Sequence, residues 1–167
     1  MNEDRAIRLD RMRFIKNTLS SSLALLAILF NVFYFINIYK SDIHTNVGNF
    51  YYQIRIGASI IYNLIFMLAA FLSSEGIKNY KIQYAYVLAA LGIGQIARIF
   101  ILPAKAAATE VTVGGVTGHV MEAAQHTRVV IYLLISAACC LAAAAVGYKR
   151  SRELAAHLAS LEQGKEE

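Results

Sequence analysis

Residues 82–102 read IQYAYVLAALGIGQIARIFIL and are followed by Pro103, the single proline of the chain. A helix of about 20 residues, rising roughly 1.5 Å per residue, crosses the hydrocarbon core of a bilayer, so this stretch is long enough for one transmembrane span. Arg98 is the one charged residue within it. Because a charge inside a membrane is costly and usually faces the protein interior or a water-filled cavity, Arg98 is the first candidate functional residue.

Three further apolar segments of similar length accompany this stretch, and we expect spans at about residues 17–39, 53–72 and 128–147. With 57% apolar and 16% charged residues, the 167-residue chain is too apolar for an ordinary soluble domain. The spans and their connections use nearly every residue. The sequence therefore predicts an all-α fold, a four-helix transmembrane bundle that forms one integral-membrane domain over residues 1–167.

Basic residues are distributed unevenly between the two ends of the predicted bundle. Of the 16 lysines and arginines, eleven lie in the two termini and the connection at 73–81, whereas four lie at the opposite end. Since cytoplasmic loops carry the excess of lysine and arginine, we expect a multi-pass protein of the cell membrane with both termini cytoplasmic and residues 103–127 outside. This placement accounts for the net charge of +5, so no nucleic-acid partner is indicated.

The connections between the spans carry turn signals. The connection at 73–81, SSEGIKNYK, is short, so the second and third spans are expected to be antiparallel neighbours. In the outer connection, TEVTV and VTGHV flank Gly114 and Gly115. Alternating threonine and valine around a two-glycine turn predicts a short β-hairpin in this outer loop.

Two features predict where the helices make contacts. Small residues let helices approach closely in lipid, and they gather on two spans. These residues are Ala85, Ala89 and Gly92 on the third span, and Ser136, Cys140 and Ala144 on the fourth. After the last span, residues 149–167 place Leu154, Leu158 and Leu161 on one face, which predicts an amphipathic cytoplasmic helix that docks on a partner.

Polar residues within and beside the spans are the candidate ligand-binding residues. They are Arg98, Arg55, Arg128, Gln95, Asn31 and Asn63, with Asp42, Glu110 and Glu122 as the outer counter-charges. One interpretation is an outward-facing site for an anionic small molecule or lipid headgroup, because guanidinium binds carboxylate and phosphate bidentately. In the other, each arginine merely extends its head to the interface. On sequence alone, Arg98→Leu removes an insertion cost of about 2.5–3.5 kcal/mol for a mid-bilayer arginine, less near the interface. It should therefore not lower the melting temperature, and it should stabilise a bundle in which the charge has no function.

The outer connection also contains a spacing that suits a metal. His119, Glu122 and His126 would line one face of a helix, and two imidazoles with one carboxylate suit zinc or iron. The hairpin predicted above competes for His119, so both structures cannot form. Neither a cofactor nor a redox site is otherwise indicated, since Cys139 and Cys140 are adjacent within an apolar run.

No glycine-rich phosphate loop, nucleophile elbow or HExxH motif is present in the sequence. We therefore expect no enzymatic activity, and a small accessory or structural membrane protein that lies in the lipid bilayer and binds another membrane protein or itself. The first alternative is a transporter, or a subunit of one, that binds an anionic ligand at the outer mouth. The second is a metal-dependent membrane enzyme that uses the two histidines and the glutamate.

Overall fold

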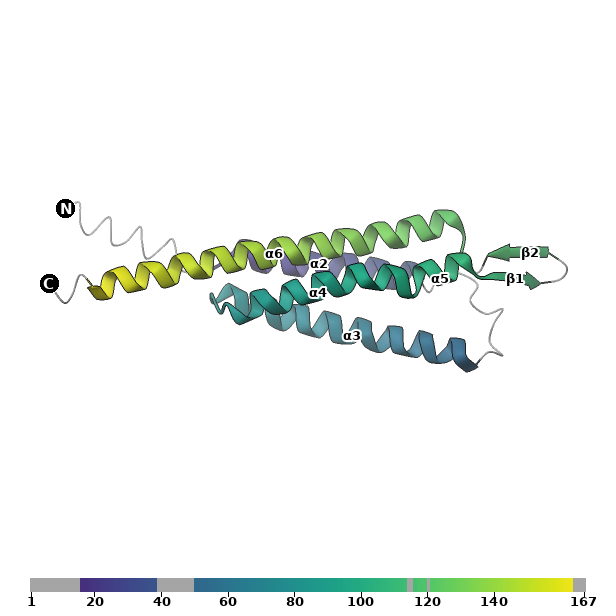
Figure 1. Ribbon diagram of the computed structural model, residues 1–167, viewed down its shortest axis with the longest axis horizontal. Helices are drawn as coiled ribbons and strands as arrows, with labels where there is room; N and C mark the ends of the chain where they lie inside the picture. The colour runs from purple at the N-terminus through teal and green to yellow at the C-terminus, as the bar shows by residue number, and fades with distance from the viewer. Residues whose placement is uncertain (1–15, 39–49, 114–115, 120, 164–167) are drawn as a thin grey trace.

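The computed structural model describes residues 16–38, 50–113, 116–119 and 121–163, and its long helices lie side by side in one elongated bundle (Figure 1). These helices are α2 (Thr18–Ile38), α3 (Phe50–Lys78), α4 (Gln83–Ile101) and α6 (Ala123–Gln163). All 4 are long and apolar enough to cross a membrane. The four-helix architecture is thus confirmed, and it is that of a multi-pass membrane protein.

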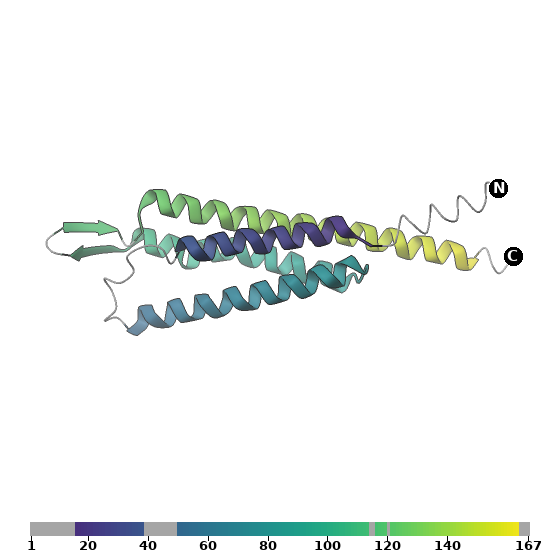
Figure 2. The same ribbon diagram turned by 180° about the vertical axis from the view of Figure 1, so that it is seen from behind.

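Helix α6 makes the most extensive contacts, because both α2 and α4 pack along it, while α3 packs against α2 and α4. Two opposite views show the N-terminal end of α3 lying away from the other helices (Figure 1, Figure 2). Several large apolar side chains of α3 are more than half exposed, namely Ile61, Leu64, Ile65 and Leu68. In a membrane protein such a face is covered by lipid, so α3 presents a lipid-facing surface near its middle.

The two ends of the bundle are distinguished by what continues beyond them. At one end the backbone N–H of Asn17 donates to the carbonyl of Lys78 at 3.0 Å, and Gly147 lies against Ile77 and Ser20. We call this the tail end, because α6 continues past it. The opposite end is called the strand end, since two short strands lie there. Helix α2 therefore begins, and the long helix α6 finishes, on the same side of the bundle.

The tail-end half is packed with small residues. Ala24, Ala143, Ala144 and Ala85 are buried there around Ile77 and Leu88. A Cβ atom added to Gly92 would come within 2.8 Å of Leu141, so α4 and α6 approach closely at this glycine. Ser136 and Cys140 are fully buried and Ala89 is partly buried. The predicted small-residue contact faces are confirmed as packing within the bundle.

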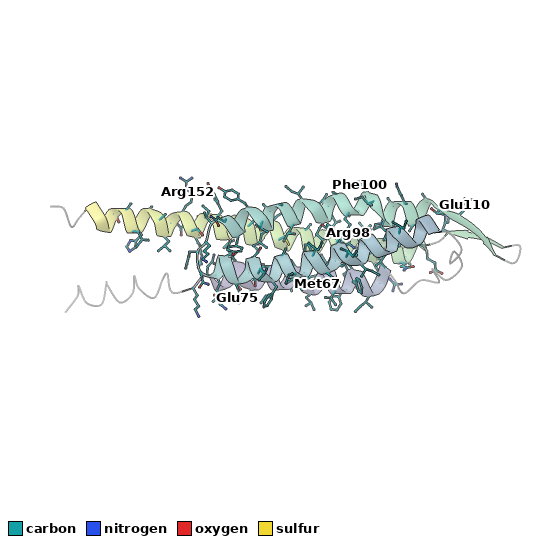
Figure 3. All side chains as sticks on the ribbon, turned by 90° about the horizontal axis from the view of Figure 1, so that it is seen from below. Met67, Glu75, Arg98, Phe100, Glu110 and Arg152 are labelled. Atoms are coloured by element: carbon teal, nitrogen blue, oxygen red, sulfur yellow. The ribbon has the colours of Figure 1, made fainter. Side chains whose placement is uncertain are left out.

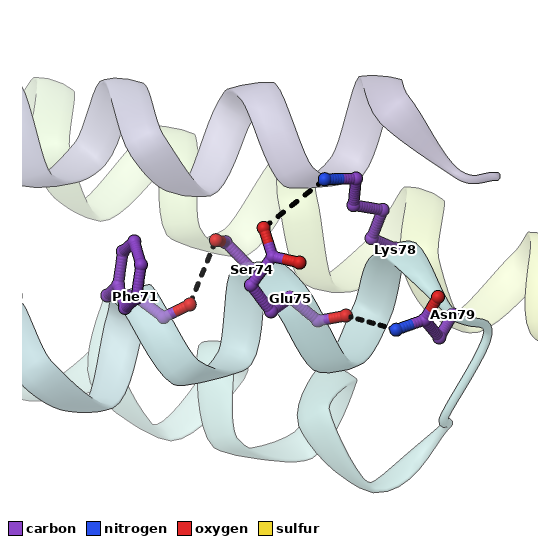
Figure 4. A network of polar contacts seen from close by, with 5 residues as sticks. All are labelled: Phe71, Ser74, Glu75, Lys78 and Asn79. Carbon is purple, nitrogen blue, oxygen red and sulfur yellow. Dashed lines mark hydrogen bonds and ion pairs between the residues drawn. The ribbon is translucent and has the colours of Figure 1, made fainter.

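The loop predicted over residues 73–81 is wrong for its first part, because α3 continues to Lys78. The polar side chains of this stretch are satisfied within the helix (Figure 4). The hydroxyl of Ser74 donates to a carbonyl one turn back at 2.9 Å, and Lys78 pairs with Glu75 at 3.3 Å. Asn79 donates its amide to the carbonyl of Glu75 at 3.1 Å. Serine and glutamate therefore continue the helix here, because a backbone carbonyl and a lysine of the same helix supply their partners.

Helix α3 ends at Lys78 and is closed by Tyr80, whose φ of 59° is left-handed. The N–H of Tyr80 donates to the carbonyl of Ile77 at 3.0 Å, and the N–H of Lys81 donates to that of Gly76 at 3.2 Å. This pair of bonds is the Schellman arrangement, which satisfies the last carbonyls of a helix. The chain reverses within residues 79–82, so α3 and α4 are antiparallel neighbours as predicted.

The connection from α4 to α6 contains three short elements. Pro103 begins α5 (Pro103–Ala108), because a proline at the first helical position gives up no needed hydrogen bond. Strand β1 (Glu110–Val113) then pairs antiparallel with β2 (Val116–His119), so that Glu110 lies opposite His119. The predicted two-glycine turn lies outside the described residues.

Helix α6 is longer than the predicted fourth span. It begins at Ala123 rather than near residue 128 and runs to Gln163 as one helix of 41 residues. Residues 149–163 of the predicted amphipathic tail therefore continue the helix of the fourth span without a break. Within it, Leu154 is half-buried and Leu158 is exposed, whereas the side chain of Leu161 lies outside the described part of the chain.

Candidate functional site

Polar side chains from three helices meet in the half of the bundle nearer the strand end, and we call them the polar layer. It comprises Asn31 and Tyr34 on α2, Ser59, Tyr62 and Asn63 on α3, and Gln95 and Arg98 on α4. On each helix the members are three or four residues apart, apart from the adjacent Tyr62 and Asn63. Side chains at this spacing share a helix face, so each helix presents its polar residues inward.

Arg98 is the centre of the polar layer and is only 5% exposed. One guanidinium nitrogen, Nη1, donates to Asn63 Oδ1 at 2.8 Å, and Nη2 donates to the hydroxyl of Ser59 at 2.9 Å. The same Nη2 lies 3.5 Å from the carbonyl oxygen of Ser59. Arg98 thus ties α4 to α3 through two side chains one helical turn apart.

Two tyrosine rings cover the guanidinium of Arg98. Its central carbon lies 4.3 Å from the ring centroid of Tyr34 and 4.7 Å from that of Tyr62. Cation–π contacts of this kind contribute up to about 2 kcal/mol each when water is excluded. Because Tyr34 belongs to α2 and Tyr62 to α3, the arginine connects three helices.

In the structure, the guanidinium of Arg98 is buried in the bundle rather than extended away from it. Its guanidinium is directed sideways to α3 and lies within the bundle, where Figure 3 places it well away from Glu110 at one end and Arg152 at the other. Periodicity puts Arg98 on the face of Gln95, but a sequence does not say whether a long side chain turns inward or outward. The hydrogen-bond partners on α3 decide it here.

A second contact in the polar layer joins α2 to α4. Gln95 Nε2 donates to Asn31 Oδ1 at 2.9 Å, and both side chains are fully buried. Asn31 Nδ2 and Gln95 Oε1 have no hydrogen-bond partner among the described residues. One donor and one acceptor are therefore left over in a buried place, where an unsatisfied polar atom costs about 1–3 kcal/mol.

The structure brings together four of the six predicted ligand-binding residues, Asn31, Asn63, Gln95 and Arg98. Arg128 and Arg55 make no described contact with these four residues. Arg128 is exposed near the start of α6, and Arg55 belongs to α3 with its side chain outside the described residues. Of the expected counter-charges, Glu110 and Glu122 are exposed at the strand end, and Asp42 lies outside the described residues.

The three candidate metal ligands do not share a helix face. His119 ends strand β2, Glu122 precedes α6, and His126 lies in the first turn of that helix. Among the described residues, no group of three histidine, cysteine, aspartate or glutamate side chains is arranged to hold a metal ion. The metal-site interpretation requires His119, Glu122 and His126 on one helix, but His119 lies in β2 and His126 lies in α6.

Sequence reasoning missed three members of the polar layer, Tyr34, Ser59 and Tyr62. A usable signal existed, because Tyr34 follows Asn31 by three residues and Ser59 precedes Asn63 by four. A polar or aromatic residue one turn from a buried asparagine shares its face and is available as its neighbour. Tyrosine and serine are common in apolar spans, however, so spacing alone did not select them.

Comparison with known proteins adds no further assignment, since the chain matches no protein-family model, no curated protein and no solved structure.

Proposed function

We propose that this protein is an accessory or structural membrane protein, without catalytic activity of its own, that acts by binding another membrane protein or a second copy of itself. The observation that carries the proposal is the extension of α6 beyond the tail end. At about 1.5 Å per residue its 41 residues span about 60 Å, roughly twice the hydrocarbon thickness of a bilayer. Residues after Tyr148 therefore run on past the other three spans for about four turns.

The extension carries an exposed apolar side chain beyond the part of α6 that packs against the other three spans. Leu158 is 52% exposed, and it lies about three turns past Gly147, which packs against Ile77 and Ser20, and about two turns past Ser151, which is still buried. Within a span, an exposed leucine is covered by acyl chains, but beyond the span it faces water or a protein. An isolated solvated helix also gains little stability from such a residue, so a docked partner accounts for the extension best.

Substitution on the extension tests the proposal. Leu158→Glu is expected to weaken self-association, measured by light scattering in detergent, or to release a stoichiometric partner cross-linked in native membranes. Ser160→Glu is the matched control, because Ser160 is also exposed and lies on nearly the opposite helix face. Deletion of residues 152–167 should act like Leu158→Glu while membrane insertion persists. Unchanged association in both altered proteins would contradict the proposal.

We also propose that both termini are cytoplasmic. The even number of spans supports a common side, and the excess of basic residues at the tail end supports the cytoplasm. Reporter fusions after Asn2 and Glu167 should both report a cytoplasmic location. An extracytoplasmic signal from either fusion would contradict this orientation.

A second candidate function, binding of an anionic ligand as a transporter or transporter subunit, is favoured by the polar layer. Asn31 Nδ2 and Gln95 Oε1 have no partner within the described part of the chain, and Arg98 lies one turn along the same face of α4 as Gln95. A ligand that both accepts and donates, such as a protonated carboxyl group or hydrogen phosphate, would suit them.

This second candidate has its own test. Acetate or phosphate should raise the melting temperature of the wild-type protein but not that of Arg98→Lys, because an ammonium group lacks the planar fork of guanidinium. Equal stabilisation of both proteins would exclude the polar layer as the ligand site.

A further inference from the structure

The first turn of α6 beyond the bundle lies at the level where the other helices begin or end. A Cβ atom on Gly147 would meet Ile77 at 2.3 Å and Ser20 at 3.0 Å, so residue 147 is still enclosed by α2 and α3. The next turn, residues 148–152, follows directly. When the apolar spans occupy the hydrocarbon core, this turn lies among the lipid headgroups.

Basic and aromatic side chains are combined on this turn. Arg152 Nη1 lies 3.3 Å from the hydroxyl oxygen of Tyr148, and its guanidinium carbon lies 5.8 Å from the centroid of the same ring. Tyr148 in turn packs edge to face with Tyr86 of α4, their centroids 6.0 Å apart. Lys149 is exposed beside them. We call Tyr86, Tyr148, Lys149 and Arg152 the basic–aromatic patch.

The charge around the basic–aromatic patch is strongly positive. Lys16, Lys78, Lys81 and Arg150 lie at the same end of the bundle, and the carboxylates described there are Glu75 and Glu153. Glu75 and Lys78 pair at 3.3 Å and cancel each other. Glu153 offsets one of the remaining positive charges, so the described residues at this end still carry an excess of positive charge. A shallow hollow next to the patch is lined by Tyr148, Lys149, Arg152, Glu153, Ala155 and Ala156. The surface is therefore complementary to a compact anion.

Apolar surface continues from the patch toward the middle of the bundle. Tyr86 is 61% exposed, and Val87 and Ile93 on the same helix are also exposed. Acyl chains would lie along such a surface while the headgroup remains at the level of the tyrosines, since tyrosine rings settle at the interface. The combination of an anionic head and an apolar tail describes a phospholipid better than it describes a soluble anion.

We propose that the basic–aromatic patch binds one anionic glycerophospholipid, whose phosphate is held by Arg152 and Lys149 and whose glycerol lies against Tyr148 and Tyr86. Guanidinium donates to two phosphate oxygens at once, and the ammonium of Lys149 adds a second positive charge. This role is separate from partner binding at Leu158. The lipid anchors the start of the extension at the membrane surface.

The test uses the full-length protein in a neutral detergent with phosphatidylglycerol or phosphatidylcholine, and bound lipid is counted by native mass spectrometry. Phosphatidylglycerol should be retained and should raise the melting temperature, whereas phosphatidylcholine should do neither. Lys149→Gln combined with Arg152→Gln should lower the affinity for phosphatidylglycerol at least about tenfold, because each basic residue near an anionic surface contributes to binding. Lys105→Gln with Arg128→Gln is the charge-matched control, since both residues are exposed at the strand end.

Salt provides a measurement that needs no variant. Raising the salt concentration from about 0.1 M to about 1 M shortens the Debye length from about 10 Å to about 3 Å, so phosphatidylglycerol should be lost from the wild-type protein. Equal binding of the two lipids, or full binding by the Lys149 and Arg152 double variant, would overturn the proposal. So would displacement of the lipid by glycerol phosphate, which has the same phosphate without acyl chains. A change in oligomeric state with lipid binding intact would assign the patch to a second copy instead.

Discussion

The tail-end half and the strand-end half of the bundle hold their helices together by different means. In the tail-end half, Gly147 packs directly against Ile77, and the hydroxyl of Ser20 donates to the carbonyl of Ala143. In the strand-end half, the side chains of Arg98 and Asn63 reach across the space between α4 and α3. The first half relies on close backbone approach, and the second relies on specific side-chain pairs.

The difference shows how a membrane protein replaces the hydrophobic effect. Lipid tails are as apolar as leucine, so helices associate through tight packing or through hydrogen bonds between them. Tight packing needs small residues at the helix interface, and many combinations of small residues allow it. A buried guanidinium needs particular acceptors at particular positions. The polar layer also lies in the half where α3 diverges from the other helices, and its hydrogen bonds join α3 to α4 there (Figure 1).

The largest expected effect concerns the tail-end half. Gly147→Ala places a methyl group 2.3 Å from the fully buried Ile77, and we expect the free energy of unfolding to fall by up to about 3 kcal/mol through overpacking. Gly57→Ala is the matched control, because a Cβ atom there meets nothing within 4 Å. Thermal unfolding in detergent measures both. If the two variants melt alike, the tail-end half is not held by close approach.

The next effect concerns the strand-end half. Arg98→Leu removes the donor to Asn63 and Ser59, and leaving buried acceptors unsatisfied costs about 1–3 kcal/mol. We therefore expect a lower melting temperature, the opposite of what the insertion cost alone predicts. A double-mutant cycle with Asn63→Leu should give a coupling energy of about 1–3 kcal/mol. Additive effects of the two substitutions would show that the pair does not join α3 to α4.

A smaller effect is expected at the amide pair. Gln95→Leu alone leaves the oxygen of Asn31 without its donor and should lower the free energy of unfolding by about 1 kcal/mol. The double variant with Asn31→Leu should recover most of this loss, because replacing both partners by apolar groups is nearly neutral. Recovery measured by thermal unfolding would mark the pair as structural. A further loss in the double variant would indicate that Asn31 and Gln95 bind something else, as the ligand-binding candidate requires.

The sequence by itself determined the number and approximate bounds of the spans. Length and continuous apolarity depend only on local composition, so residues 82–102 were recognisable without any neighbour. The small residues Ala85 and Gly92 of α4 and Cys140 of α6 were also predictable as contact positions. Helical periodicity places the small residues of each span on one face, and small residues let helices approach closely in lipid. The helix bounds at Lys78 and Ala123 were missed, because serine and glutamate near α3 and polar residues before the last span resemble loop composition.

Only the tertiary structure decided what the polar residues do. Arg98 has the same sequence surroundings whether it reaches the interface or turns inward, and its direction depends on Asn63 and Ser59, which precede it by 35 and 39 residues. His119 and His126 have a spacing that suits a metal on a helix, but hydrogen bonding between β1 and β2 places the first of them in a strand. Periodicity specifies the face of a helix, whereas a partner across the bundle specifies the contact, because only folding brings distant segments within hydrogen-bond distance.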